Sequence, residues 1–260
     1  MSKILKNLLL NKIIIFCLIL LLSTSAILTI YKLRHDIKHK IISLSEESYF
    51  LDKLPNDNDV YWAHEILKGG YILHFRHAER DKWIDVQMYD ALESDLYPKL
   101  NLENLAENTY YANAVCLNER GKIQARAIGE HIKNINLPVS YVVSSPSCRA
   151  RQTAEKSFGG YDLVDRILVH AGPYNEKFTN RWKTLKDFYY ELPDEKLKSG
   201  NIIVSAHNGV LLKKMFDNKF SFKLELEEGG FYVISKTKNG LKMEHKFNNF
   251  RFFSGVFYER

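Results

Sequence analysis

Apolar residues follow two different periods along this chain, and segments of the two kinds alternate. Short, mostly apolar runs are typical of buried strands, and they occur at 71–75, 139–143, 166–169 and 202–205. Apolar residues at helical spacing predict helices, and these patterns occupy 119–135, 148–158, 181–190 and 208–216. Strands that alternate with helices predict an α/β domain, built as a three-layer sandwich around a mostly parallel central sheet.

The longest of the predicted helices, 119–135, shows the helical spacing most clearly. Asn118 stands directly before it and can serve as its N-cap. The face predicted to pack against the sheet carries Ile123, Ala127, Ile128 and Ile132.

The last part of the chain is predicted to close the domain. Two short runs, 231–235 and 241–245, flank Asn239-Gly240, a turn sequence typical of a β-hairpin. The aromatic residues of 247–258 are expected to complete the core. In contrast, residues 80–115 show no clear period and are long for a connection, which predicts a functional lid or insertion.

The N-terminal part contains an uncharged stretch of 19 residues, 13–31. As a helix it would span roughly 28 Å, close to the ~30 Å hydrocarbon core of a bilayer. One interpretation is an uncleaved transmembrane anchor, and the other is a signal peptide cleaved near Thr24-Ser25-Ala26. Both predict a membrane-anchored or exported protein with an extracytoplasmic, periplasmic domain. The predicted divisions are a basic N-terminus (1–12), the anchor or signal peptide (13–31), a juxtamembrane stalk (32–59) and the domain (60–260).

The charge distribution removes nucleic acid from the candidate partners. The chain has a net charge of +6, and 45% of its residues are hydrophobic, which excludes disorder for most of it. The excess is confined to residues 1–40, which contain seven basic residues and one acidic residue. The rest of the chain is electrically balanced, so the basic character belongs to the N-terminus alone.

Three segments place polar side chains directly after predicted strands, where ligands bind in open α/β sheets. These segments are Phe75 to Arg80, Ser144 to Thr153, and Ser205 to Gly209. Arginine matches the oxygens of a phosphate group, and histidine can act as a nucleophile toward phosphorus. His74 points to the opposite face of its strand and is expected to be a packed core histidine.

The three motifs, in this order, resemble those of the histidine phosphatase superfamily, which is related to phosphoglycerate mutase. The resemblance covers about residues 69–216. It implies that His77 is the nucleophile that becomes phosphohistidine. It also implies that Arg76 and Arg149 hold the phosphoryl oxygens together with His207, the second histidine of the pocket.

The resemblance also implies a proton donor. Glu176, in the segment Tyr174-Asn175-Glu176-Lys177, corresponds to that group, and Glu79 is the competing candidate. Arg80 is a further candidate contact for an anionic substrate. The reaction needs no metal and no cofactor, because catalysis is mostly positioning and electrostatic stabilisation of the transferring phosphoryl group.

A closer resemblance concerns the substrate. The His-Phe-Arg-His-Ala-Glu-Arg stretch at 74–80 and the short apolar N-terminal segment are similar to the lipopolysaccharide core heptose phosphate phosphatases. The partner implied is a phosphorylated small molecule or glycan, such as an envelope saccharide. The alternatives are a catalytically silent phosphoglycan-binding module and a phosphoglycerate-type mutase.

Two of the three cysteines fall within the predicted domain. Cys17 lies in the apolar segment, which leaves Cys116 and Cys148 as an even pair. Free buried thiols and a disulfide are both open for this pair. An exported domain meets an oxidising environment, where the pair could close into a disulfide.

Overall fold

The computed structural model describes residues 33, 55–81, 115–169 and 181–258. The chain divides into two units, 1–54 and 55–260, and every labelled element discussed below belongs to the second. The predicted anchor or signal peptide at 13–31 lies outside the described residues. Within the described part of the chain, no helix is long and apolar enough to cross a membrane.

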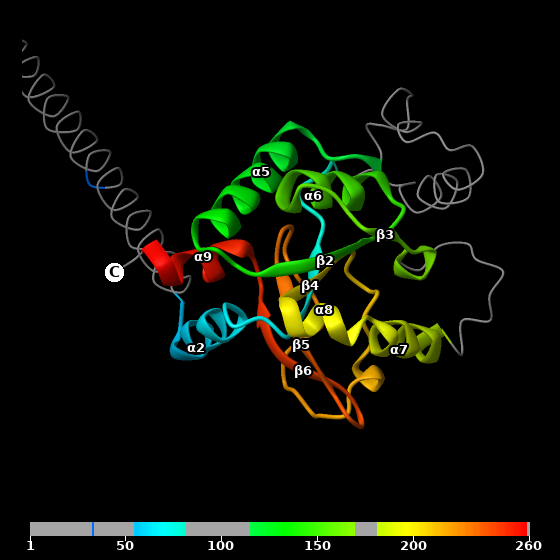
Figure 1. The fold of residues 1–260 in the computed structure, drawn as a ribbon. Helices are drawn as coiled ribbons and strands as arrows, with labels where there is room; N and C mark the ends of the chain where they lie inside the picture. The colour runs from blue at the N-terminus through cyan, green and yellow to red at the C-terminus, as the bar shows by residue number, and fades with distance from the viewer. Residues whose placement is uncertain (1–32, 34–54, 82–114, 170–180, 259–260) are drawn as a thin grey trace, which may run out of the picture. The chain divides into compact units, whose positions relative to one another are not determined.

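A six-stranded sheet forms the centre of the described domain (Figure 1). Its spatial order is β3-β2-β4-β1-β5-β6. The first four strands are mutually parallel, while β5 and β6 run antiparallel as the predicted hairpin. The strands are β1 (Ile72–Arg76), β2 (Val139–Ser144), β3 (Leu163–Val164), β4 (Asn201–Ala206), β5 (Phe231–Thr237) and β6 (Gly240–Phe247). The prediction of an α/β fold with a mostly parallel sheet is confirmed.

Helices cover both faces of this sheet and form a hydrophobic core on each side. One core joins the sheet to α2, α5, α6 and α9, as Ala63, Ile128, Ala154 and Phe253 show. The other joins it to α7 and to two short 3₁₀ helices, η1 and η2. The helices are α2 (Asp57–Ile66), α5 (Glu119–Asn134), α6 (Cys148–Phe158), η1 (Arg166–Leu168), α7 (Arg181–Glu191), α8 (Asp194–Ser199), η2 (Lys213–Met215) and α9 (Phe250–Tyr258).

The register of the parallel strands brings three strand ends to one edge. Ser205 of β4 pairs with Phe75 of β1 and with Ser144 of β2. The residues after these strands continue the pairing, because the His77 N–H donates to the Ala206 carbonyl at 3.0 Å. The three polar segments identified in the sequence therefore lie side by side at the carboxyl edge of the sheet.

Helix α5 follows the prediction except at Ile123 and Ala127, which are both exposed. The Asn118 side chain caps it by accepting a hydrogen bond from the Gly121 N–H. Ile128 and Ile132 are buried, but Ile123 is 59% exposed, and Ala125 packs inward in its place. Gly121 is required here, since a Cβ on it would lie 1.9 Å from the Glu79 carbonyl oxygen. The helix thus packs backbone to backbone against the segment that follows β1.

Two predicted elements are wrong. The strand at 166–169 is instead the 3₁₀ helix η1, because the Asp165 side chain caps it by accepting from the Ile167 N–H. The helix at 208–216 is replaced by a turn followed by η2. Gly209 has a φ of +78°, in the left-handed region that a right-handed helix excludes.

Candidate active site

His77 lies just beyond the end of β1 and is almost fully buried. Its Nδ1 lies 2.7 Å from the Ala78 carbonyl oxygen. A carbonyl only accepts hydrogen bonds, so Nδ1 carries the proton and Nε2 of the neutral ring carries the lone pair. Burial, together with the charge of Arg149, holds the pKa of His77 well below its usual value. At neutral pH the ring is therefore uncharged, as a nucleophile requires.

His207 follows β4 and lies directly beside His77. The two rings meet edge to face, with centroids 5.3 Å apart. The Nε2 of His207 is 3.0 Å from the Ser145 hydroxyl, which belongs to the segment after β2. All three strand ends of the parallel edge therefore contribute to one cluster.

Two arginines bring positive charge to this cluster. Arg149 is fully buried in the first turn of α6, where the exposed N–H groups of a helix also favour anions. Arg76 ends β1, and its guanidinium pairs with the Glu228 carboxylate at 2.6 Å and donates to the Leu226 carbonyl. The arrangement is chemically suited to bind a phosphoryl group next to an imidazole nucleophile.

Hydroxyl groups from neighbouring segments fix the first turn of α6. Thr153 Oγ1 accepts a hydrogen bond from the Ala78 N–H at 3.0 Å and donates to the Arg149 carbonyl at 2.7 Å. Ser205 Oγ donates to the Ala150 carbonyl at 2.8 Å. These bonds tie β4 and the segment after β1 to the turn that carries Arg149.

A disulfide also holds this turn. Cys116 and Cys148 are bonded to each other, with Cα atoms 4.8 Å apart, and both are buried. Cys148 immediately precedes Arg149. The bridge therefore joins the start of α6 to the segment that leads into α5.

Of the other predicted site residues, the structure describes Glu79 and Arg80 but not Glu176. Glu79 forms an ion pair with Arg120 at 2.6 Å and accepts a hydrogen bond from the Asn118 amide at 3.1 Å. Arg80 donates to the Asp81 carbonyl at 2.6 Å. Glu176 lies outside the described residues. Residues 55–81, 115–169 and 181–258 contain no group of three or more His, Cys, Asp or Glu side chains that could hold a metal ion.

The sequence reasoning missed two residues that support the site. His74 is buried as predicted, yet its Nε2 also lies 3.3 Å from the His207 carbonyl oxygen. Glu228 pairs with Arg76 from the loop before β5. Only the pairing of β1 with β4 and β5 brings these residues together, and no motif in the sequence signals it.

Part of the chain matches a protein-family model. Residues 101–165 match the model described as the histidine phosphatase superfamily, branch 1. The match covers 65 of the 260 residues and includes the segment from Ser144 to Thr153. It supports the resemblance seen in the motifs. No curated protein matches the chain significantly.

Solved structures similar to the chain include two phosphatases. The protein histidine phosphatase SixA, complexed with tungstate, is 13% identical, with a TM-score of 0.45. The similarity covers 68% of this chain and 95% of that one. A phosphoserine phosphatase from Entamoeba histolytica, in complex with 3-phosphoglyceric acid, is also 13% identical, with a TM-score of 0.42. That similarity covers 70% of this chain and 98% of the other.

Proposed function

We propose that this chain belongs to the histidine phosphatase superfamily and hydrolyses phosphomonoesters through a phosphohistidine at His77. One observation carries the proposal. The neutral ring of His77, with its lone pair on Nε2, lies against the ring of His207 at the carboxyl edge of the sheet. At the same edge, Arg76 ends β1 and Arg149 lies in the first turn of α6. The match of residues 101–165 to the superfamily model supports it.

The proposed reaction has two balanced steps. Nε2 of His77 attacks phosphorus in line, the bond from phosphorus to the ester oxygen breaks, and a carboxylic acid gives its proton to the departing alkoxide. Water then attacks phosphorus, and the carboxylate takes a proton from that water. The bond from phosphorus to Nε2 breaks and returns its electron pair to the imidazole, and inorganic phosphate leaves. Arg76, Arg149 and His207 stabilise the negative charge on the equatorial oxygens in both steps.

We assign the proton-donating acid to Glu176. The rival, Glu79, is held by a hydrogen bond from Asn118 and an ion pair with Arg120. Glu176 lies in the segment Tyr174-Asn175-Glu176-Lys177, which resembles the proton-donor segment of the family. Glu176→Gln should slow the hydrolysis of alkyl phosphates by roughly 10²–10⁴-fold. Aryl phosphates, whose leaving groups need little protonation, should be much less affected. Equal losses on both substrate types would contradict this role, and a selective loss in Glu79→Gln would transfer it to Glu79.

The nucleophile is tested by His77→Ala with p-nitrophenyl phosphate as substrate. The change removes the only atom proposed to form the covalent bond, so activity should fall by about 10³–10⁶-fold. His64→Ala is the matched control, because His64 is exposed on α2 and has no proposed role in the reaction. A His77→Ala variant that folds normally and keeps more than about a thousandth of the activity would refute the proposal.

We further propose that the substrate is a phosphorylated envelope saccharide and that the domain is extracytoplasmic, tethered or exported through residues 13–31. The Cys116–Cys148 disulfide supports an oxidising compartment. The likeness of the 74–80 stretch to the heptose phosphate phosphatases of lipopolysaccharide supports the sugar. Screening the purified protein against phosphorylated sugars and lipids tests the substrate class. A clear preference for a phosphate ester that is not a saccharide would contradict it.

A further inference from the structure

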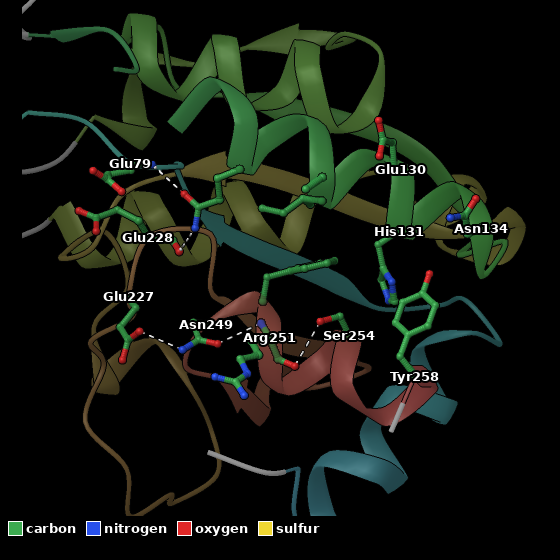
Figure 2. Close-up of a pocket in the computed structure, with 14 residues that line it drawn as sticks. Glu79, Glu130, His131, Asn134, Glu227, Glu228, Asn249, Arg251, Ser254 and Tyr258 are labelled. Atoms are coloured by element: carbon green, nitrogen blue, oxygen red, sulfur yellow. Dashed lines mark hydrogen bonds between the residues drawn. The ribbon is translucent and has the colours of Figure 1, made fainter. Parts of the chain in front are cut away.

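A groove of about 620 Å³ runs between α5 and α9 (Figure 2). Glu79 and Glu228 lie toward one end of it, and His131 and Tyr258 lie toward the other. The site described above does not use the far end.

The near end of the groove adjoins the phosphate site. Glu79 is two residues beyond His77, and Glu228 pairs with Arg76 at 2.6 Å. Gln124 of α5 joins these two sides, since it accepts from the Glu79 N–H at 2.9 Å and donates to the Glu228 carbonyl at 2.8 Å. Arg76, His77, Arg149 and His207 do not line the groove, so the leaving group of a phosphoester bound at His77 enters it by passing over Gln124.

The far end holds a buried polar group that lacks a partner. His131 is only 6% exposed, and neither of its ring nitrogens has a hydrogen-bond partner among the described residues. Its ring lies near those of Phe250 and Tyr258, with centroids 5.4 and 5.0 Å away. Buried polar atoms are rarely left unpaired, so this ring indicates a ligand that supplies the missing hydrogen bond. Burial lowers the pKa of His131, which keeps one nitrogen available as an acceptor.

The charge of the groove selects the kind of ligand. Its described lining includes four carboxylates but only one guanidinium, that of Arg251. Glu79 is paired with Arg120, and Glu228 is paired with Arg76. Glu227 accepts hydrogen bonds from the neutral amides of Asn248 and Asn249, which leave its charge in place. The field therefore favours a cation and opposes a second phosphate. Aromatic rings beside a neutral imidazole also suit an ammonium group, through cation–π attraction and a hydrogen bond.

We propose that this groove binds the leaving group of the phosphoester, and that this group carries an ammonium that binds at His131, Phe250 and Tyr258. The class of substrate is thus a phosphorylated oligosaccharide that carries an amine remote from the phosphate. The inference rests on the proposed phosphatase function and narrows its substrate. His131 lies seven positions after Gln124 on α5, about 10 Å along the helix, so the ligand must span about that distance between the two ends of the groove.

Binding of non-hydrolysable phosphonates tests this inference without requiring turnover. The full chain is titrated by calorimetry with ω-aminoalkylphosphonates of two to ten carbons, and with the alkylphosphonates of equal length. The amine should improve affinity by about tenfold or more once the chain reaches roughly six carbons, because a partly desolvated charge contact contributes at that level. The two-carbon pair should show no such difference.

Variants assign the effect to the groove. His131→Phe keeps an aromatic ring in the same surroundings but removes the acceptor, so it should fold normally and lose most of the preference for the long amine. Glu227→Gln should weaken the preference for the long amine, because it removes one negative charge from the groove. Glu119→Gln is the control, since Glu119 is an exposed carboxylate on the same helix that pairs with Lys122 outside the groove.

Two outcomes would overturn the inference: an amine preference that is absent or independent of chain length, and one that survives in His131→Phe. Hydrolysis of p-nitrophenyl phosphate, measured on the same preparation, separates the two proposals. Activity without amine preference refutes the groove assignment alone. Amine preference without activity refutes the phosphatase function and keeps the groove as a binding site.

Discussion

His74 connects the site to the hydrophobic core beneath it. Its Nε2 faces the His207 carbonyl, which only accepts, so Nε2 carries the proton and Nδ1 accepts from the Tyr189 hydroxyl at 2.5 Å. Burial raises the pKa of Tyr189 well above its usual value, which keeps that hydroxyl a donor. A single neutral tautomer of His74 thus supports the backbone of His207.

This neutral histidine makes the protein sensitive to acid. Burial lowers the pKa of His74 to about 4 from the ~6.5 of the unfolded chain, so the unfolded state binds more protons between these two values. Stability should fall as the pH falls from about 6.5 to about 4, by up to roughly 3 kcal/mol from this residue, and no further below pH 4. Glutamine does not titrate in this range, so His74→Gln should reduce the slope of the free energy of unfolding against pH by the equivalent of about one proton. Urea unfolding at pH 7, 6, 5 and 4 measures this slope. An unchanged slope would contradict the prediction, since His77 and His131 remain in both proteins.

Helix α6 is the element on which the proposed phosphate-binding geometry depends. Its first turn carries Arg149 and is held by Cys148, by the Thr153 hydroxyl and by Ser205 of β4. The motif that begins at Ser144 predicted this helix correctly, because both its N-terminal boundary and its apolar face are local features. The same local reasoning failed for 208–216, where Val210 and Leu211 are buried on a chain that Gly209 has already turned out of a helix.

The disulfide at the start of α6 should contribute both stability and binding. It joins residues 32 positions apart, for which the chain-entropy model gives roughly 3–4 kcal/mol. Reduction should therefore lower the melting temperature and weaken the affinity for inorganic phosphate. The Cys116→Ser/Cys148→Ser double variant should show the same losses and no response to reductant. Two free thiols in protein isolated from the cell envelope, detected by mass spectrometry of non-reduced peptides, would contradict both the bridge and the proposed compartment.

Across the whole domain, the sheet topology determines how much of the site the sequence could predict. Arg76, Arg149 and His207 were identifiable because each one ends a strand, follows a strand or starts the helix after one, and parallel strands end at one edge. Glu228 and the contact of His74 with His207 arise from the order β4-β1-β5, which periodicity alone does not encode. The groove beside α5 likewise depends on where α9 packs. Residues at strand ends are thus predictable from one sequence, whereas their supporting contacts require the three-dimensional arrangement.

The most direct test of the central claim is to trap the covalent intermediate. The protein is mixed rapidly with p-nitrophenyl phosphate, quenched in alkali, where phosphohistidine is stable, and digested for mass spectrometry. The account predicts one phosphoryl group on the peptide that contains His77, attached to its imidazole and lost on exposure to acid. A phosphoryl group on another residue, or active turnover with no trapped phosphohistidine in either the wild-type protein or Glu176→Gln, would contradict it.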